Sequence, residues 1–102
     1  MNWKFHIEKL KNGEATSFRP KGNSMLPRIE SGNQVTVSPD ISVIQETDIV
    51  FCKVHGTYYV HLVKGKKVEG ETERYLIGNN KGGTNGWITK NGIFGKVTEI
   101  SP

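Results

Sequence analysis

The sequence predicts a mainly β fold of antiparallel strands and hairpins, with little helix. Of the 102 residues, 12 are glycine and 34% are hydrophobic, a composition that suits a turn-rich β protein better than a helical one. Apolar and polar residues alternate over short runs such as Gln34–Ser38, and this period of two is typical of strands with one buried face. Turn dipeptides such as Asn12-Gly13 and Asn91-Gly92 follow or separate these runs.

The first 19 residues are expected to form an N-terminal strand or hairpin. Apolar and polar residues alternate over most of residues 2–10, which predicts a strand with one apolar face. The Lys-Asn-Gly sequence at 11–13 is typical of a tight hairpin turn, after which residues 14–19 would form a second strand paired with the first. A helix over residues 2–11 is the alternative.

The core of the fold is expected within residues 20–100. A loop rich in Gly, Asn, Ser and Pro comes first and contains a short helical turn at 25–29. The clearest hairpin is joined at His55-Gly56, because apolar runs stand on both sides of that turn. The predicted strands are residues 34–38, 48–54, 57–64, 74–77, 87–89 and 93–100, with exposed turns at 65–67 and 69–71 and a flexible glycine-rich loop at 78–86.

Length and charge limit what the chain can be. At 102 residues it is expected to form a single domain, residues 1–102. Its formal net charge of +4 is mild and its lysines are scattered, so nucleic-acid binding is not expected. No run approaches the roughly 20 apolar residues of a membrane span, and the N-terminus is not a secretory signal. We therefore expect a soluble protein without a membrane anchor, of a size that suits a phage or mobile-element protein.

Cys52 is the only cysteine in the sequence. It can form no internal disulfide, and no cysteine-based metal site is possible, which fits a reducing compartment such as the cytoplasm. It lies in the apolar run Ile49–Cys52, which predicts a buried thiol rather than a nucleophile. No metal and no cofactor are expected.

Ser24 is the candidate nucleophile. It lies between Gly22 and Pro27 and shortly before the strand predicted at Gln34–Ser38. Glycine permits positive φ and proline restricts φ, so the two frame a tight and rigid turn. A hydroxyl held on such a turn can stand clear of the core with backbone N–H groups nearby to receive an oxyanion. The residue pattern alone is equally that of an ordinary loop serine, because a serine nucleophile needs a base that sequence proximity cannot reveal.

The segment around this serine reads Gly22-Asn23-Ser24-Met25-Leu26-Pro27 and continues as Gly32-Asn33-Gln34-Val35. It resembles the nucleophile box of the LexA-like and signal-peptidase-like serine peptidases, Gly-x-Ser-Met-x-Pro followed by Gly-Asp-x-Val. Later segments are similar to further boxes of that family and follow its order: Asp48-Ile49-Val50, Tyr59-Val60-His61-Leu62-Val63, Gly78-Asn79-Asn80 and Ile93-Phe94-Gly95-Lys96-Val97. The resemblance covers residues 18–100 and implies the coiled β fold of that superfamily.

The resemblance also implies a base for Ser24. One branch of the family uses a lysine and another uses a histidine in a Val-His-Arg-Val context, to which Val60-His61-Leu62-Val63 is similar. His61 is therefore the candidate general base, and a neutral imidazole can accept a serine proton near pH 7. Lys53 and Lys64 are the alternatives, although neither stands at the matching position. The alternative interpretation of His61 is a histidine that only packs within a strand and has no catalytic role.

The sequence departs from the family pattern around this base. Where the histidine branch has an aspartate that orients the imidazole, the matching positions are Asn79 and the Thr84-Asn85 pair. An asparagine can orient a histidine through a hydrogen bond, but it cannot stabilise the imidazolium as a carboxylate does. Asn33 and Leu62 replace the usual Asp and Arg, and Gly22 stands where signal peptidases have a serine that supports the oxyanion. That support would then come from the backbone N–H of Ser24, with Asn23 and Met25 beside it.

Two functions follow from these features. The first is a soluble serine peptidase with a Ser24–His61 dyad that cleaves an extended protein or peptide segment, for which the family implies small residues before the scissile bond. The second is a catalytically weak or inactive module of the same fold that binds a partner protein or forms a homodimer through its C-terminal strands, near 93–100. The resemblance does not extend to self-cleavage at the family's usual bond, because neither Ala-Gly nor Cys-Gly occurs in the chain.

Overall fold

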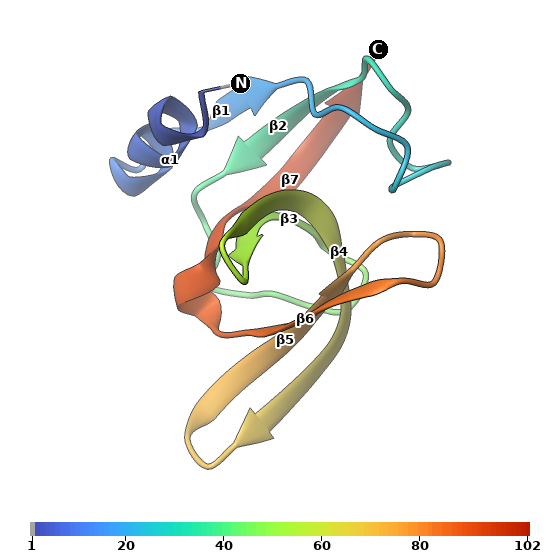
Figure 1. Cartoon of the computed structure of the whole chain (residues 1–102). Helices are drawn as coiled ribbons and strands as arrows, with labels where there is room; N and C mark the ends of the chain where they lie inside the picture. Colours follow the sequence, from blue (N-terminus) through green and yellow to red (C-terminus); the bar gives the residue numbers. More distant parts are fainter. Residues whose placement is uncertain (1) are drawn as a thin grey trace.

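The structure is a computed structural model that describes residues 2–102. Over these residues seven antiparallel strands form one strongly curved sheet in the order β1-β2-β7-β3-β4-β5-β6 (Figure 1). The mainly β prediction is therefore confirmed. The elements are α1 (Trp3–Lys11), β1 (Thr16–Phe18), β2 (Gln34–Ser38), β3 (Ile49–Val54), β4 (Thr57–Glu69), β5 (Thr72–Gly78), β6 (Thr84–Ile88), the 3-10 turn η1 (Lys90–Gly92) and β7 (Ile93–Ser101).

Strand β3 lies at the centre of the sheet and is buried on both faces. It pairs with β7 on one side and with β4 on the other. Ile49 and Phe51 point into one hydrophobic cluster, whereas Val50, Cys52 and Val54 point into a second. A strand covered on both faces reads as a continuous apolar run, which is why this stretch stands out in the sequence. Cys52 is fully buried, and burial raises the pKa of its thiol to about 12.

The N-terminal segment is a helix, so the prediction of a strand over residues 2–10 is wrong and the alternative is right. The Asn2 side chain accepts a hydrogen bond from the Phe5 backbone N–H at 3.1 Å and caps the first turn. Trp3, Ile7 and Leu10 pack against the first cluster, a spacing that fits a helix, while Phe5 is 54% exposed. The alternation is therefore incidental, because only the helical face is buried.

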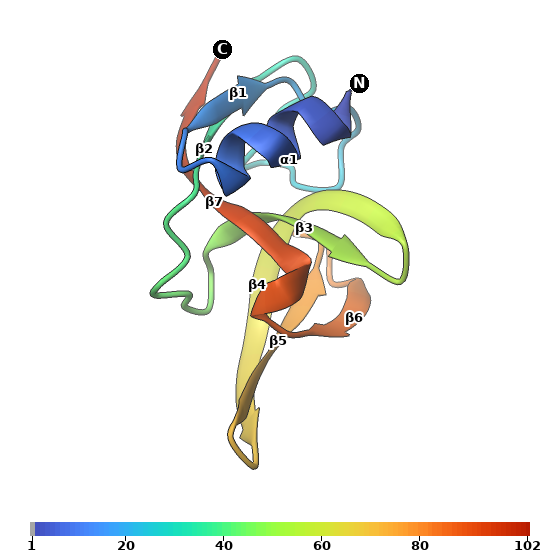
Figure 2. The same cartoon turned by 90° about the vertical axis from the view of Figure 1, so that its left-hand side faces the viewer.

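The predicted N-terminal hairpin is also absent from residues 2–19. Instead of a hairpin turn, Gly13 ends α1 with φ of +81° and donates its N–H to the Leu10 carbonyl at 3.0 Å. Strand β1 is shorter than expected and pairs with β2, placing Phe18 opposite Val35. Figure 2 shows α1 between β1 and the curve formed by β3 and β4. Helix α1 thus covers the sheet, whereas β1 extends it at one edge.

The β4–β5 hairpin is longer than the sequence predicts. The turns expected at 65–67 and 69–71 are replaced by strand: residues 65–69 continue β4 and pair with 72–76 of β5, so that the turn is confined to Gly70-Glu71. The hairpin extends away from the rest of the molecule in Figure 1. Strand β6 begins within the predicted glycine-rich loop, which leaves residues 79–83 as the connection. Strand β6 begins earlier than predicted because its backbone pairs with β5, and the glycine content of the segment does not indicate this pairing.

Candidate active site

The loop that carries Ser24 is anchored by two buried side chains. Met25 and Ile29 are each 4% exposed and belong to the first hydrophobic cluster. The Ile29 N–H donates to the Met25 carbonyl at 3.0 Å, which gives the predicted single helical turn. Gly22, two residues before Ser24, has φ of +102°, a conformation that side-chain-bearing residues rarely adopt. A side chain at this position would therefore be strained in the present backbone conformation.

Strand β4 brings His61 to this loop from 37 positions along the chain. His61 is 7% exposed, and its Nε2 lies 2.9 Å from Ser24 Oγ. It pairs with Val50 of β3, so the imidazole is carried by a strand in the middle of the sheet rather than by a loop. A base within hydrogen-bonding distance of a hydroxyl can take its proton. Ser24 and His61 are thus in the arrangement that a nucleophile and its base require.

Asn85 of β6 holds the other nitrogen of the imidazole. Its Oδ1 lies 2.7 Å from His61 Nδ1. Because a side-chain carbonyl oxygen only accepts, Nδ1 carries the proton and Nε2 is left free to accept from the Ser24 hydroxyl. Three side chains from one loop and two strands therefore form a single chain of hydrogen bonds, Asn85–His61–Ser24.

The environment of His61 favours the neutral imidazole. Burial lowers its pKa below the ordinary 6.5, and the hydrogen bond to Asn85 opposes this effect in part. The ring also stacks on Tyr59, with centroids 4.6 Å apart. A neutral amide rather than a carboxylate touches Nδ1, so a protonated imidazolium would be held only by dipoles. The site favours a histidine that is unprotonated near pH 7.

The connection at 79–83 ties β6 to the serine loop. Asn79 folds it, because its Oδ1 accepts from the backbone N–H groups of Lys81 and Gly83 at 2.8 and 2.9 Å. Asn80 then donates its backbone N–H to the Ser24 carbonyl and its side-chain Nδ2 to the Leu26 carbonyl, both at 2.9 Å. Asn79 therefore shapes the loop and does not touch His61, while Asn80 connects it to the nucleophile segment.

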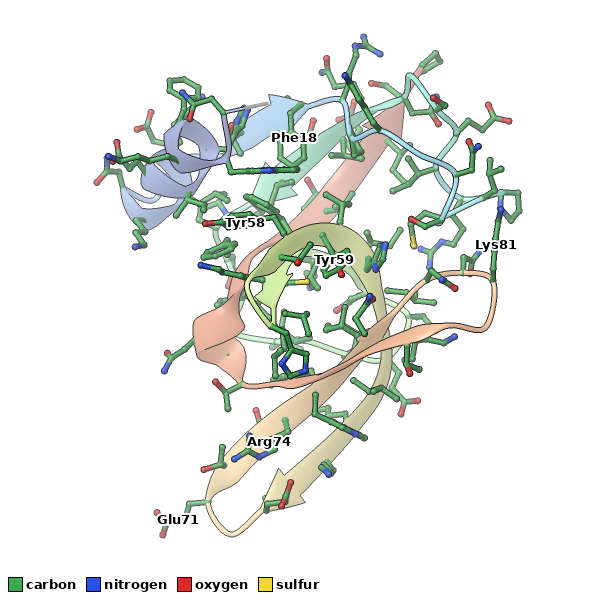
Figure 3. All side chains as sticks on the ribbon, in the orientation of Figure 1. Phe18, Tyr58, Tyr59, Glu71, Arg74 and Lys81 are labelled. Atoms are coloured by element: carbon green, nitrogen blue, oxygen red, sulfur yellow. The ribbon has the colours of Figure 1, made fainter. Side chains whose placement is uncertain are left out.

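A cleft of about 520 Å³ opens beside the Ser24–His61 pair. It is lined by residues 58–61 of β4, by Pro20, Lys21 and Gly22, and by Met25 and Ile29. Trp3 of α1 also lines it. Figure 3 shows Tyr58 below Phe18, in the space between α1 and the arch of β4. Most of the residues that line the cleft are apolar or aromatic, and Lys21, Ser24 and His61 add polar side chains.

The other candidate residues have different surroundings. Asn23 is exposed, and Met25 is buried while it also lines the cleft. Lys53 lies over the Tyr58 ring at 5.1 Å, and Lys64 Nζ is 3.5 Å from the Gly83 carbonyl oxygen. His61, and not a lysine, is therefore the partner of Ser24. Among the described residues no group of three or more His, Cys, Asp or Glu side chains could hold a metal ion.

Comparison with known proteins identifies the family of the chain. The model of the Peptidase S24-like family matches residues 3–98, essentially the whole chain. The protein therefore belongs to the Peptidase S24-like family, as the resemblance of the serine box predicted. No curated protein matches the sequence. None of the helices in residues 2–102 has the length and apolar character needed to cross a bilayer.

Sequence reasoning missed three contributors to this site. Tyr59 stands two positions before His61, and the period of a strand alone places both on one face. Asn80 belongs to the segment Gly78-Asn79-Asn80, which resembles a family segment, but the residues around it do not indicate that it binds the serine loop. Trp3 falls in a segment whose pattern predicts a strand, so the sequence does not indicate its place in the cleft.

Proposed function

We propose that this protein is a serine peptidase in which Ser24 is the nucleophile, His61 the general base and Asn85 the residue that orients the base. The observation that carries the proposal is the hydrogen-bonded chain from Asn85 through His61 to Ser24, at 2.7 and 2.9 Å. Membership in a peptidase family makes a peptide or protein chain the expected class of substrate. The single cysteine is consistent with action in a reducing compartment such as the cytoplasm.

In the proposed acylation step, Ser24 Oγ attacks the scissile carbonyl carbon while its proton passes to His61 Nε2. His61 then donates that proton to the amine nitrogen as the C–N bond breaks, leaving an acyl ester on Ser24. A water molecule, deprotonated by His61, attacks the ester, and the proton returns to Ser24 when the acid leaves. Asn85 holds the Nδ1–H tautomer that the cycle needs.

The oxyanion of the tetrahedral intermediate needs donors of its own. We assign this role to the backbone N–H of Ser24, with the adjoining Asn23–Met25 backbone. Gly22 supplies no hydroxyl, and one missing donor costs about 10² to 10³ in rate. Together with the uncharged Asn85, this predicts slow turnover compared with a triad that has a carboxylate.

The substrate would bind as an additional strand. Residues 57–61 of β4 pair with β3 on one side, and β5 pairs with β4 only from Leu62 onward. Within residues 2–102 the second edge of 57–61 has no strand partner and borders the cleft that holds Ser24. An extended peptide can hydrogen-bond to such an edge with its own backbone. A peptide bound in this way would place one of its backbone carbonyl groups beside Ser24.

The second candidate is a peptide-binding module of the same fold with little turnover, and the neutral Asn85 favours it. It would use the same β4 edge to hold a partner chain without cleaving it. Dimerisation through β7 is a weaker form of this candidate, because β7 already pairs with β2 along 96–101 and with β3 along 93–96. Only its remaining edge near the partly exposed Ile100 would be available to a second copy.

The test is acylation of the intact protein by a serine-directed phosphonate probe, followed by mass spectrometry. Wild type should be labelled once, at Ser24, and His61→Ala should be labelled at least about 100-fold more slowly, since general base catalysis typically contributes 10² to 10⁴. Ser24→Ala should not be labelled. His55→Ala is the matched control, because His55 is exposed on the β3–β4 turn, and it should react like wild type. Equal labelling of wild type and His61→Ala would refute the dyad.

A further inference from the structure

Trp3 connects the N-terminal helix with the candidate active site. It lies in the cleft that also contains Ser24 and His61. Its indole stacks on Tyr58 with centroids 5.6 Å apart, and it packs against Phe18 and Phe51 at 5.7 and 5.2 Å. An aromatic ring held by three others is a rigid wall.

The two faces of β4 give the cleft two chemically different sides. Side chains alternate along a strand, so Tyr59 and His61 share one face and Tyr58 and Val60 share the other. Val60 belongs to the first hydrophobic cluster, and Tyr58 packs against it. A peptide paired with this edge would direct its own side chains alternately to the same two faces. Of the two residues that flank a scissile bond, one would therefore point to the Tyr58 face.

We propose that Trp3 forms, with Tyr58, Val60, Met25 and Ile29, a hydrophobic subsite that selects a large apolar side chain within two residues of the scissile bond. This inference rests on the proposed function for the position of the bond. All five residues line the same cleft of about 520 Å³. Trp3 is thereby a specificity-determining residue, and the substrate class is an extended peptide with Leu, Met or Phe at that position.

This proposed subsite differs from the expectation, drawn from the family resemblance, that small residues precede the bond. A small side chain such as alanine would leave the Trp3 and Tyr58 rings without contact, and an acidic one would lose its hydration beside them. A large apolar side chain would instead cover both. Pockets of this kind discriminate by about tenfold or more for each added methylene group.

The experiment uses peptides that differ only at the four positions nearest the candidate bond, each occupied in turn by Ala, Leu, Phe or Asp. Cleavage is measured with wild type. Binding is measured separately with Ser24→Ala, through the fluorescence of Trp3 in a Trp87→Phe background, because Trp87 is the other tryptophan of the chain. At one position, Leu or Phe should be favoured over Ala by at least about tenfold in both measurements.

The variant Trp3→Ala should reduce this preference to less than about threefold. Its binding is measured with a labelled peptide, because this variant lacks the fluorescence of Trp3. Trp3→Phe should retain most of it. Trp87→Ala is the matched control: Trp87 is 38% exposed, lies on β6 under Lys67 and does not line the cleft, so its loss should leave the preference unchanged. Should Trp3→Ala fail to fold, the preference of wild type for Leu or Phe over Ala still decides whether the subsite exists.

The results separate this inference from the proposed function. Cleavage with no apolar preference, or a preference for Ala, overturns the subsite while the peptidase stands. Binding of Leu or Phe peptides that depends on Trp3, without cleavage or labelling of Ser24, supports the subsite and rejects the peptidase. A preference that persists unchanged in Trp3→Ala overturns the role of Trp3.

Discussion

Replacing Asn85 by aspartate tests the chemistry of the site most directly. The substitution is isosteric and places a carboxylate oxygen where the amide oxygen lies 2.7 Å from His61 Nδ1. A charge-assisted hydrogen bond is about twice as strong as a neutral one, which adds about 1–2 kcal/mol in favour of the imidazolium. Because 1.36 kcal/mol corresponds to a factor of ten in rate, Asn85→Asp should accelerate acylation of Ser24 by about 5- to 30-fold.

The same carboxylate should raise the pKa of His61, because a negative charge beside Nδ1 stabilises the imidazolium. In wild type, burial holds this pKa below 6.5, so the rate should rise with pH below neutrality and reach a plateau near pH 7. In Asn85→Asp the rise should move to higher pH. The rates must therefore be compared on the plateaus, near pH 8.5 or above, where both imidazoles are neutral.

The assay is the rate of phosphonate labelling as a function of pH, with NMR titration of the His61 ring as an independent measure of its pKa. Asn91→Asp is the matched control, because it adds the same charge on the exposed turn η1 and should change neither quantity. A slower plateau rate in Asn85→Asp, with its His61 pKa raised as expected, would refute the view that the missing charge limits catalysis.

Three further predictions concern stability. Burial lowers the pKa of His61 in the folded protein, so the unfolded chain takes up a proton at this histidine at higher pH than the folded one. The contribution of the neutral His61 to the free energy of unfolding should therefore be complete above pH 6.5 and decrease as the pH falls towards the lower folded pKa. Urea denaturation at several pH values should show a less steep decrease in His61→Gln. Asn80→Ala should cost about 1 kcal/mol through loss of the bond to the Leu26 carbonyl and should slow Ser24 labelling. Gly95→Ala should cost about 1–3 kcal/mol, because its Cβ would lie 2.5 to 2.6 Å from atoms of β2, whereas Gly32→Ala, with open space around it but φ of +90°, should cost about 1 kcal/mol.

Each of these has a contrary result. An unchanged pH dependence in His61→Gln would place the titrating group elsewhere. Normal labelling by Asn80→Ala would show that the 79–83 connection does not position Ser24. A smaller loss in Gly95→Ala than in Gly32→Ala would mean that β2 and β7 can separate without cost.

The parts of this protein that the sequence predicts are those with a strong local signal. The run Ile49–Cys52 and the turn at His55-Gly56 predict β3 and its hairpin with β4. The order of boxes around Ser24 and His61 predicts the Peptidase S24-like family, which the family comparison shows. Asn85 was named with Asn79 as a candidate to orient His61, and it is Asn85 that makes the contact.

The tertiary structure alone decided what long-range contacts control. The alternation over residues 2–10 favours a strand, and the burial of Trp3, Ile7 and Leu10 against the sheet selects the helix instead. The choice between Asn79 and Asn85 depends on how β6 pairs with β5, which brings residues 24 positions apart in the chain into contact. Sequence determines local propensity and motif order; the distance between two side chains depends on packing and register, which every strand of the sheet sets together.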